Sequence, residues 1–323
     1  PLRYGLVQAL AVEESGKGGQ GASVLDASWN KVENYPNHAM PNLMLGNHDL
    51  VRFGDLLERG NFNQADYWQR HKAAFSFLAA RSGPITLYYG EEFGDEVPGF
   101  AAQVSGDCAA QGLCDDHVAR SDGKVPGVTG FTPSGEQAEL KQWLGQLLAL
   151  RAAHPALYQG ERVKLVAEGS VYGDIKQTAA EQVVYLLNVS TTPQSYALPV
   201  GKLRSASALV DLQSGESLAI GGSSVTVDLP PLSGRFLLGT DASGRDIAAQ
   251  IAHGARTTLL MGIVSTLIAI AIIAFFVVMW LPSHPMWLII TVSAVFIVGV
   301  LSLFFTAGDS KHNPNLDQNG TAV

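Results

Sequence analysis

The chain has 323 residues, enough for two or three domains, with a formal net charge of −8 and only 15% charged residues. An acidic chain is poorly suited to a polyanionic partner, so these numbers argue against nucleic acid as a partner. Neutral substrates such as sugars are compatible with the charge.

The first residues resemble the middle of a secondary-structure element more than its start. Pro1 is not preceded by Met, and no signal peptide is present in the sequence. Residues 5–14 are predicted to form a short helix, and Val24–Tyr35 a second, irregular helix. We expect the chain to begin inside a longer protein.

The most informative segment follows, at Pro41–Arg52. The apolar residues Leu43–Leu45 predict a buried strand, which ends in Asn47-His48-Asp49. A strand that ends in this way delivers polar side chains to the rim of a parallel sheet. A single Asn-His-Asp triplet is more often a helix cap with a structural histidine, so the triplet alone does not establish a functional site.

These polar residues suit the chemistry of a sugar-cleaving site. His48 can donate hydrogen bonds to sugar hydroxyls. Asp49 can bind ring hydroxyls more strongly as positive charge develops at the anomeric carbon. Arg52, three residues further on, can hold a carboxylate in place.

A helix and a second apolar run come next. Asn63 is expected to cap a helix from about Gln64 to Ala80, and Ile85–Tyr89 is predicted to be a second buried strand, closed by Gly90. Strand, helix and strand with short links are typical of a parallel α/β sheet.

A long polar segment, Glu91 to Gly135, separates this unit from the next helix. Cys108 and Cys114 within it are either a small loop disulfide or two free thiols. Three aspartates in the loop (Asp107, Asp115, Asp116) leave structural calcium possible, but their spacing matches no standard calcium loop. No cofactor is therefore predicted.

The C-terminal pattern changes from helix to short strands. Ser134 is expected to cap a helix that stops at His154-Pro155. A small antiparallel β-sandwich is predicted to follow, with a structural or sugar-contacting role. Its six predicted strands are Val163–Val166, Val183–Leu187, Ser195–Leu198, Ala208–Leu212, Val225–Leu229 and Arg235–Leu238.

The order of these segments resembles the α-amylase family of glycoside hydrolases. The likeness runs from Pro1 to about Leu238 and includes Gly83-Pro-Ile-Thr-Leu-Tyr-Tyr-Gly-Glu-Glu-Phe-Gly94, which is similar to the eighth strand of that family's (β/α)₈ barrel and the loop after it. The resemblance implies that Asp49 is the transition-state-stabilising aspartate and His48 a substrate-binding histidine. We predict that Asn47 and Arg52 also bind substrate. It also implies an α-glucan or maltooligosaccharide substrate and a retaining mechanism.

One departure from the family is large. Its nucleophile and its acid/base glutamate lie on the fourth and fifth strands, which would precede Pro1. Glu91 and Glu92 follow the eighth strand and cannot replace them. We therefore expect this chain alone to be catalytically incomplete.

The last eighty residues have a different character. Thr258–Leu281 and Met286–Ala307 are uncharged runs of 24 and 22 residues, which predict a two-helix transmembrane hairpin and a membrane-associated protein. The segment from Leu238 to Gly262 resembles the entry to a transmembrane helix in permease subunits of peptide ABC importers. A fused or composite chain at about Gly239 is one interpretation.

The predicted organisation is a partial (β/α)₈ barrel at 1–158, an all-β domain at 159–238, a linker at 239–257, the hairpin at 258–307 and a polar tail at 308–323. The leading hypothesis is a fragment of an α-amylase-family glycosidase. The alternative is a membrane transport component, or a composite chain, that carries a non-catalytic sugar-binding domain.

Overall fold

The computed structural model describes residues 2–11, 19–33, 40–62, 66–100, 119–120, 123–124, 126–204 and 206–240. They belong to the first of two compact units, Pro1–Ile251. The predicted hairpin at 258–307, the polar tail, most of the linker, the cysteine pair and the three loop aspartates lie outside the described residues.

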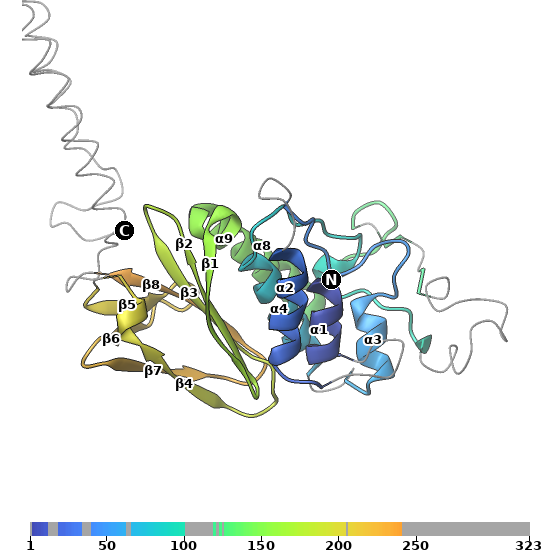
Figure 1. Cartoon of the computed structure of the whole chain (residues 1–323). Coiled ribbons are helices and arrows are strands. Elements are labelled where there is room, and N and C mark those ends of the chain that lie inside the picture. Colours follow the sequence, from blue (N-terminus) through green and yellow to red (C-terminus); the bar gives the residue numbers. More distant parts are fainter. Residues whose placement is uncertain are drawn as a thin grey trace, which may run out of the picture. The chain divides into compact units, whose positions relative to one another are not determined.

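Six α-helices occupy the first half of the described chain (Figure 1). They are α1 (Leu2–Leu10), α2 (Ser23–Glu33), α3 (Phe53–Arg59), α4 (Tyr67–Ala79), α8 (Glu136–Ala153) and α9 (Pro155–Gln159), with a short 3₁₀ turn, η1, at Glu91–Phe93. The four predicted helices are present, with shifted ends. The predicted Ser134 side-chain cap is wrong, because Gly135 is the N-cap of α8 and only the backbone carbonyl of Ser134 accepts a bond, from the Gln137 N–H.

The two predicted buried strands meet in parallel, but over one bridge only. Leu43 pairs with Ile85: its N–H donates to Pro84 O at 2.8 Å, and its carbonyl accepts the Thr86 N–H at 2.8 Å. Leu43 and Leu45 are each 1% exposed, so the first segment is buried as predicted. The second is not, because Tyr89 is 40% exposed. Among the described residues Ile85 pairs only with Leu43, so no second strand covers its other edge.

The second half of the chain forms two antiparallel sheets, as predicted. The larger has the order β1-β2-β3-β8-β5-β6 and the smaller is the pair β4-β7 (Figure 1). The strands are β1 (Glu161–Glu168), β2 (Val171–Gln177), β3 (Gln182–Asn188), β4 (Gln194–Pro199), β5 (Ala208–Asp211), β6 (Ser217–Ala219), β7 (Ser224–Leu229) and β8 (Gly234–Thr240), with a 3₁₀ turn, η2, at Val200–Lys202. Two strands, β2 and β6, were not predicted.

The two faces of the larger sheet bury different cores. One face packs against the small sheet, where Ile175, Val184 and Leu237 share an apolar cluster with Leu198 and Val227. Residues of the other face, including Tyr172 and Tyr185, belong to the cluster that contains the helices. Alternation of side chains along each strand supplies both faces.

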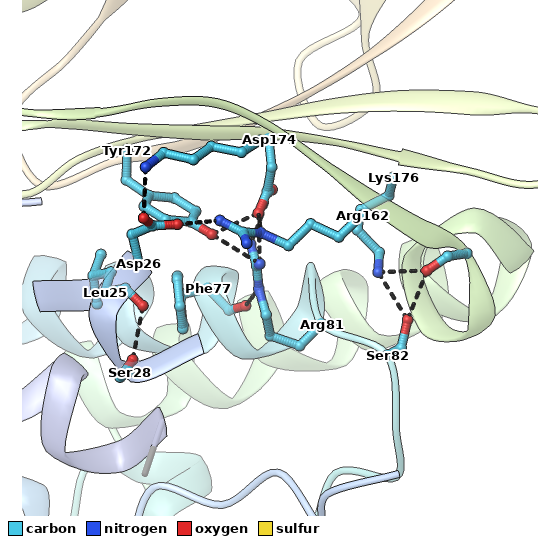
Figure 2. A network of polar contacts seen from close by, with 12 residues as sticks. Leu25, Asp26, Ser28, Phe77, Arg81, Ser82, Arg162, Tyr172, Asp174 and Lys176 are labelled. Carbon is cyan, nitrogen blue, oxygen red and sulfur yellow. Dashed lines mark hydrogen bonds and ion pairs between the residues drawn. The ribbon is translucent and has the colours of Figure 1, made fainter. Parts of the chain in front are cut away.

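A buried ion network joins the helices to β1 and β2 (Figure 2). Asp174 on β2 is fully buried and accepts hydrogen bonds from Arg81, just after α4, from Arg162 on β1 and from the Tyr172 hydroxyl. Arg162 also reaches Asp26 on α2, at 2.5 Å from Nη2 to Oδ1. Because each buried charge has an opposite partner, the network is compatible with burial.

The prediction of a membrane location requires correction. In the ranges that the structure describes, no helix has both the length and the apolar character needed to cross a bilayer. The hairpin on which that prediction rested lies outside those ranges.

Candidate functional site

The two parallel segments bring two turns to the same end of the helical part. After Leu43 the chain reaches Asn47-His48-Asp49, and after Ile85 it reaches Tyr88 and Tyr89. Parallel strands place their carboxyl ends at one edge, which is where barrel enzymes carry their active sites. The two segments are linked beyond the bridge by Arg52, which follows the triplet and lies against both tyrosine rings.

The triplet forms a turn that presents His48 and Asp49 to solvent. Asn47 Oδ1 accepts the Asp49 N–H at 2.9 Å, so the Asn47 side chain shapes the turn. His48 Nε2 lies 3.3 Å from Asp49 Oδ2, and the two side chains are 75% and 67% exposed. An exposed imidazole beside an exposed carboxylate offers a donor and an acceptor to a polar ligand.

Arg120, more than seventy residues away in sequence, joins this pair. Its Nε donates to the His48 carbonyl at 3.1 Å, and its Nη2 lies 3.9 Å from Asp49 Oδ1. The Arg120 side chain is 44% exposed. No motif in the sequence identified it, because its proximity to Asp49 exists only in the folded chain.

A buried arginine on α1 holds the triplet from below. Arg3 Nε donates to Leu45 O at 2.8 Å and Arg3 Nη2 to Val51 O at 2.6 Å, so one guanidinium bridges the two ends of the turn. Gly46 lies between them. A Cβ at this position would lie 2.7 Å from Glu91 Oε1, so the backbone of the turn packs closely against the Glu91 carboxyl.

Arg52 lies beneath the turn, not on its surface. Its side chain is 2% exposed, and Nη1 donates to the Tyr89 carbonyl at 2.7 Å. Nη2 lies 3.8 Å from Asp95 Oδ2, so the expected pairing with a carboxylate is present. The guanidinium also sits 4.9 and 4.6 Å from the ring centroids of Tyr88 and Tyr89. In this position Arg52 has no open surface for a substrate.

Glu91 completes the buried layer. It is 5% exposed, and its Oε2 accepts the Tyr88 N–H at 3.0 Å. Burial raises the pKa of Glu91 to about 8, although Arg52 and Arg3 act in the opposite direction. At neutral pH most of this carboxyl is therefore protonated, which makes it a supporting group and not an attacking carboxylate.

Metal binding finds no support near this site. Among the residues that the structure describes, no group of three or more His, Cys, Asp or Glu side chains is placed to hold a metal ion. His48, Asp49 and Arg120 thus gather an imidazole, a carboxylate and a guanidinium at the exposed part of the candidate site.

Comparison with solved structures shows which proteins this chain is similar to. A structure of AmyP in complex with maltose is 48% identical to this chain with a TM-score of 0.69, and the match covers 76% of this chain and 50% of AmyP. A variant of AmyP in complex with maltotriose matches equally well, at 48% identity and a TM-score of 0.69, over 75% of this chain and 49% of the other. The chain thus spans about half the length of these structures.

A more distant structure shares the fold alone. The α-amylase from Geobacillus thermoleovorans in complex with acarbose is 19% identical with a TM-score of 0.55, over 74% of this chain and 47% of that one. No family model and no curated protein matches the chain. The structural neighbours are α-amylase-family glycosidases, and the chain is closely similar to the AmyP structures over part of its length. Nothing in the comparisons supports the permease resemblance.

Proposed function

We propose that this chain is part of an α-amylase-family glycosidase that acts on α-linked glucans or maltooligosaccharides with retention of configuration. The observation that carries the proposal is the 48% identity to AmyP, whose structures hold maltose and maltotriose. The exposed His48–Asp49 pair at the end of a parallel segment supports it, because polar groups at that edge are where such enzymes bind sugar.

In this proposal Asp49 stabilises the transition state. Positive charge develops at the anomeric carbon during glycoside cleavage, which polarises the neighbouring ring hydroxyls. A carboxylate that accepts hydrogen bonds from those hydroxyls then binds more tightly in the transition state than in the ground state. His48 donates to the same sugar unit, and the Arg120 guanidinium keeps the Asp49 side chain in place.

Asn47 and Arg52 support these two side chains in the proposal. The Asn47 side chain is engaged in the turn, and Arg52 fixes the chain at Tyr89 from below. We assign both as positioning residues, which for Arg52 replaces the direct substrate contact expected from the sequence.

Catalysis by this chain alone is not part of the proposal. Retaining cleavage needs a nucleophilic carboxylate and a carboxylic acid about 5–5.5 Å apart across the scissile bond. By the family resemblance both belong to strands outside this chain, and Glu91 is buried at the base of the turn. We therefore propose that residues 1–238, without those two carboxylates, bind the glucan but do not cleave it.

Binding and cleavage by the purified full chain test the proposal. Maltotriose should shift the His48 imidazole signals in NMR spectra, whereas cellotriose should not, and no glucose or maltose should form. Asp49→Asn should weaken this binding about tenfold, the effect of losing one charged hydrogen bond. Glu139→Gln is the matched control, because Glu139 is a similarly exposed carboxylate, 60% exposed, in an ion pair with Lys72.

Two results would contradict the proposal in different ways. Maltotriose cleavage that Asp49→Asn abolishes would show that the chain is catalytically complete. Unchanged maltotriose binding in both Asp49→Asn and His48→Ala would show that the pair does not bind sugar.

A further inference from the structure

A second hollow lies in the β-sheet part of the chain, and the proposed function does not use it. Its volume is about 630 Å³, within the range of about 300–1,000 Å³ that small-molecule sites occupy. The end of β7, the turn between β5 and β6 and the start of β8 line it, together with Pro193 and Gln194 at the start of β4. None of its lining residues belongs to the His48–Asp49 site.

Arg235 makes the wall of this pocket rigid. The residue is 8% exposed, and its Nε lies 2.6 Å from Asp211 Oδ2 while its Nη2 lies 2.5 Å from Glu216 Oε2. Its Nη1 donates to the Asp228 carbonyl at 3.1 Å. One guanidinium thus joins β5, the β5–β6 turn, β7 and β8. A wall fixed in this way loses little entropy when a ligand binds.

The β5–β6 turn is held by the same carboxylate. Asp211 Oδ1 accepts the backbone N–H groups of Gln213 and Ser214, at 2.9 and 3.1 Å. Gln213 and Ser214 are both exposed and line the pocket. The turn therefore presents an amide and a hydroxyl to the pocket from a fixed backbone.

The charge of the pocket excludes anions. Its lining contains the carboxylates of Asp211, Glu216 and Asp228 and the single cation Arg235, which is a balance of −2. The Arg235 guanidinium is already engaged on all three nitrogens. A phosphate or carboxylate ligand would meet excess negative charge with no cation to receive it.

The remaining lining combines apolar rings with neutral polar groups. Pro193, Pro230 and Pro231 supply ring faces, and Gln194 and Gln213 supply amides that both donate and accept. An uncharged ligand with apolar C–H faces and many hydroxyls satisfies both kinds of surface. A sugar has this composition, and exposed carboxylates such as Asp228 are strong acceptors for its hydroxyl groups.

From this arrangement we infer that the pocket on the β-sheet part is a second binding site for a neutral oligosaccharide. The ligand that fits the comparisons is an α-linked glucan, because AmyP structures hold maltose and maltotriose. The inference does not depend on the role of Asp49. A chain with two such sites would hold a long glucan at two points and gain affinity for polymers over short oligosaccharides.

Titration of the full chain with maltotriose tests this site. In NMR spectra of the unmodified chain, the backbone signals of Gln213, Ser214 and Asp228 should shift as a group. The double variant Gln213→Ala/Asp228→Ala should weaken that binding about tenfold, because it removes two hydrogen-bonding groups from exposed positions. Gln142→Ala/Glu161→Ala, also at exposed positions, is the matched control and should bind as the unmodified chain does.

The outcomes separate this inference from the proposed function. Shifts at Gln213 and Asp228 that survive in Asp49→Asn support a separate site, whatever the role of Asp49. Shifts confined to the surroundings of His48 and Asp49 would overturn the second site and leave the proposed function intact. Equal weakening by the pocket variant and by its matched control would also overturn it.

Discussion

Arg81 and Asp174 form a bidentate ion pair between the end of α4 and the middle of β2. Nη1 lies 2.6 Å from Oδ2 and Nη2 3.1 Å from Oδ1, and both side chains are 0% exposed (Figure 2). The parallel geometry of the two bonds suits a guanidinium and a carboxylate. This pair is the most deeply buried link between the helical part and the sheet among the ion pairs of the described residues.

Asp174→Asn should destabilise the protein strongly. The change leaves Arg81 buried without a full negative charge beside it, and breaking one partner of a buried pair costs about 3–5 kcal/mol. Urea unfolding followed by circular dichroism measures the free energy of unfolding of each variant. Asp228→Asn, at an exposed position of β7, is the control and should change it by less than about 0.5 kcal/mol. A loss below about 1 kcal/mol in Asp174→Asn would contradict a structural role for the pair.

The strand that carries Asp174 shows where sequence patterns fail. β2 has the sequence Val-Tyr-Gly-Asp-Ile-Lys-Gln, and its glycine and two charged residues hide an otherwise regular alternation. In the fold Asp174 is neutralised by Arg81, and Lys176 is bonded to Ser82 and Gly160. Gly173 has no room for a side chain, because a Cβ there would lie 2.5 Å from Leu186 Cδ2. The partners of the two charged residues include Arg81 and Ser82, which are 93 and 94 residues from Asp174 and Lys176 in the sequence.

The candidate site also contains residues that a local sequence pattern predicts and residues that only the fold brings together. His48 and Asp49 follow an apolar run, so a local pattern is enough to predict their exposed position at a strand end. Arg120 meets Asp49 from more than seventy residues away in the sequence. Glu91 accepts the nearby Tyr88 N–H, but its position against Gly46 exists only in the folded chain. For Arg52 the sequence indicated the carboxylate partner but not the depth of burial, since burial depends on how Tyr88 and Tyr89 cover it.

Lys176 should make stability increase with pH over an alkaline range. Burial lowers the pKa of Lys176 to about 7, and the nearby guanidinium groups of Arg81, Arg162 and Arg151 act in the same direction, while Asp174 opposes them. In the unfolded chain the amine titrates near 10.5. Between pH 7 and pH 10.5 the unfolded state therefore binds more protons, so the free energy of unfolding rises with pH.

Lys176→Met removes this dependence while keeping most of the side-chain volume. Urea unfolding at pH 7, 8, 9 and 10 should show a smaller rise in stability for the variant than for the unmodified chain. Lys141→Met, at an exposed position of α8, controls for the change in net charge. If the free energy of unfolding changes with pH by the same amount in Lys176→Met and Lys141→Met, Lys176 is not the source of the pH dependence.

Glu91 should have the opposite effect at lower pH. Its pKa is raised to about 8 in the folded chain from an ordinary value of 4.5, so the folded state binds more protons between these values. The contribution of Glu91 to the free energy of unfolding is fully present below pH 4.5 and is lost as the pH rises to about 8. Asp55, with a pKa raised by burial to about 7, adds to the same trend.

Glu91→Gln keeps an oxygen that can accept the Tyr88 N–H but cannot ionise. Its free energy of unfolding should therefore fall less between pH 5 and pH 8 than that of the unmodified chain. Glu92→Gln is the matched control, because the neighbouring Glu92 is only partly buried and its Oε2 accepts the Gly90 N–H. Equal slopes in Glu91→Gln and Glu92→Gln would show that burial of Glu91 does not shift its titration.

Arg52 and Arg120 both lie beside the candidate site, and their different burial separates a positioning role from a binding role. Arg52→Gln removes the ion pair with the buried Asp95 and the bond to the Tyr89 carbonyl, so we expect a loss of about 3 kcal/mol in the free energy of unfolding. Arg120 is 44% exposed, so its ion pair with Asp49 should contribute less than about 1 kcal/mol to the free energy of unfolding. Arg120→Gln should therefore lower stability by no more than this amount.

Maltotriose binding by the same two variants should change in the reverse order: Arg120→Gln should lose more affinity than Arg52→Gln, although it loses less stability. Arg120→Gln should weaken binding at the His48–Asp49 pair, since Arg120 holds the turn from the exposed side. Arg52→Gln, measured well below its unfolding midpoint, should bind maltotriose with an affinity within about threefold of the unmodified chain if Arg52 only supports Tyr89, because it then makes no sugar contact. If Arg52→Gln remains as stable as the unmodified chain but loses maltotriose binding, Arg52 contacts the sugar directly and the positioning role is wrong.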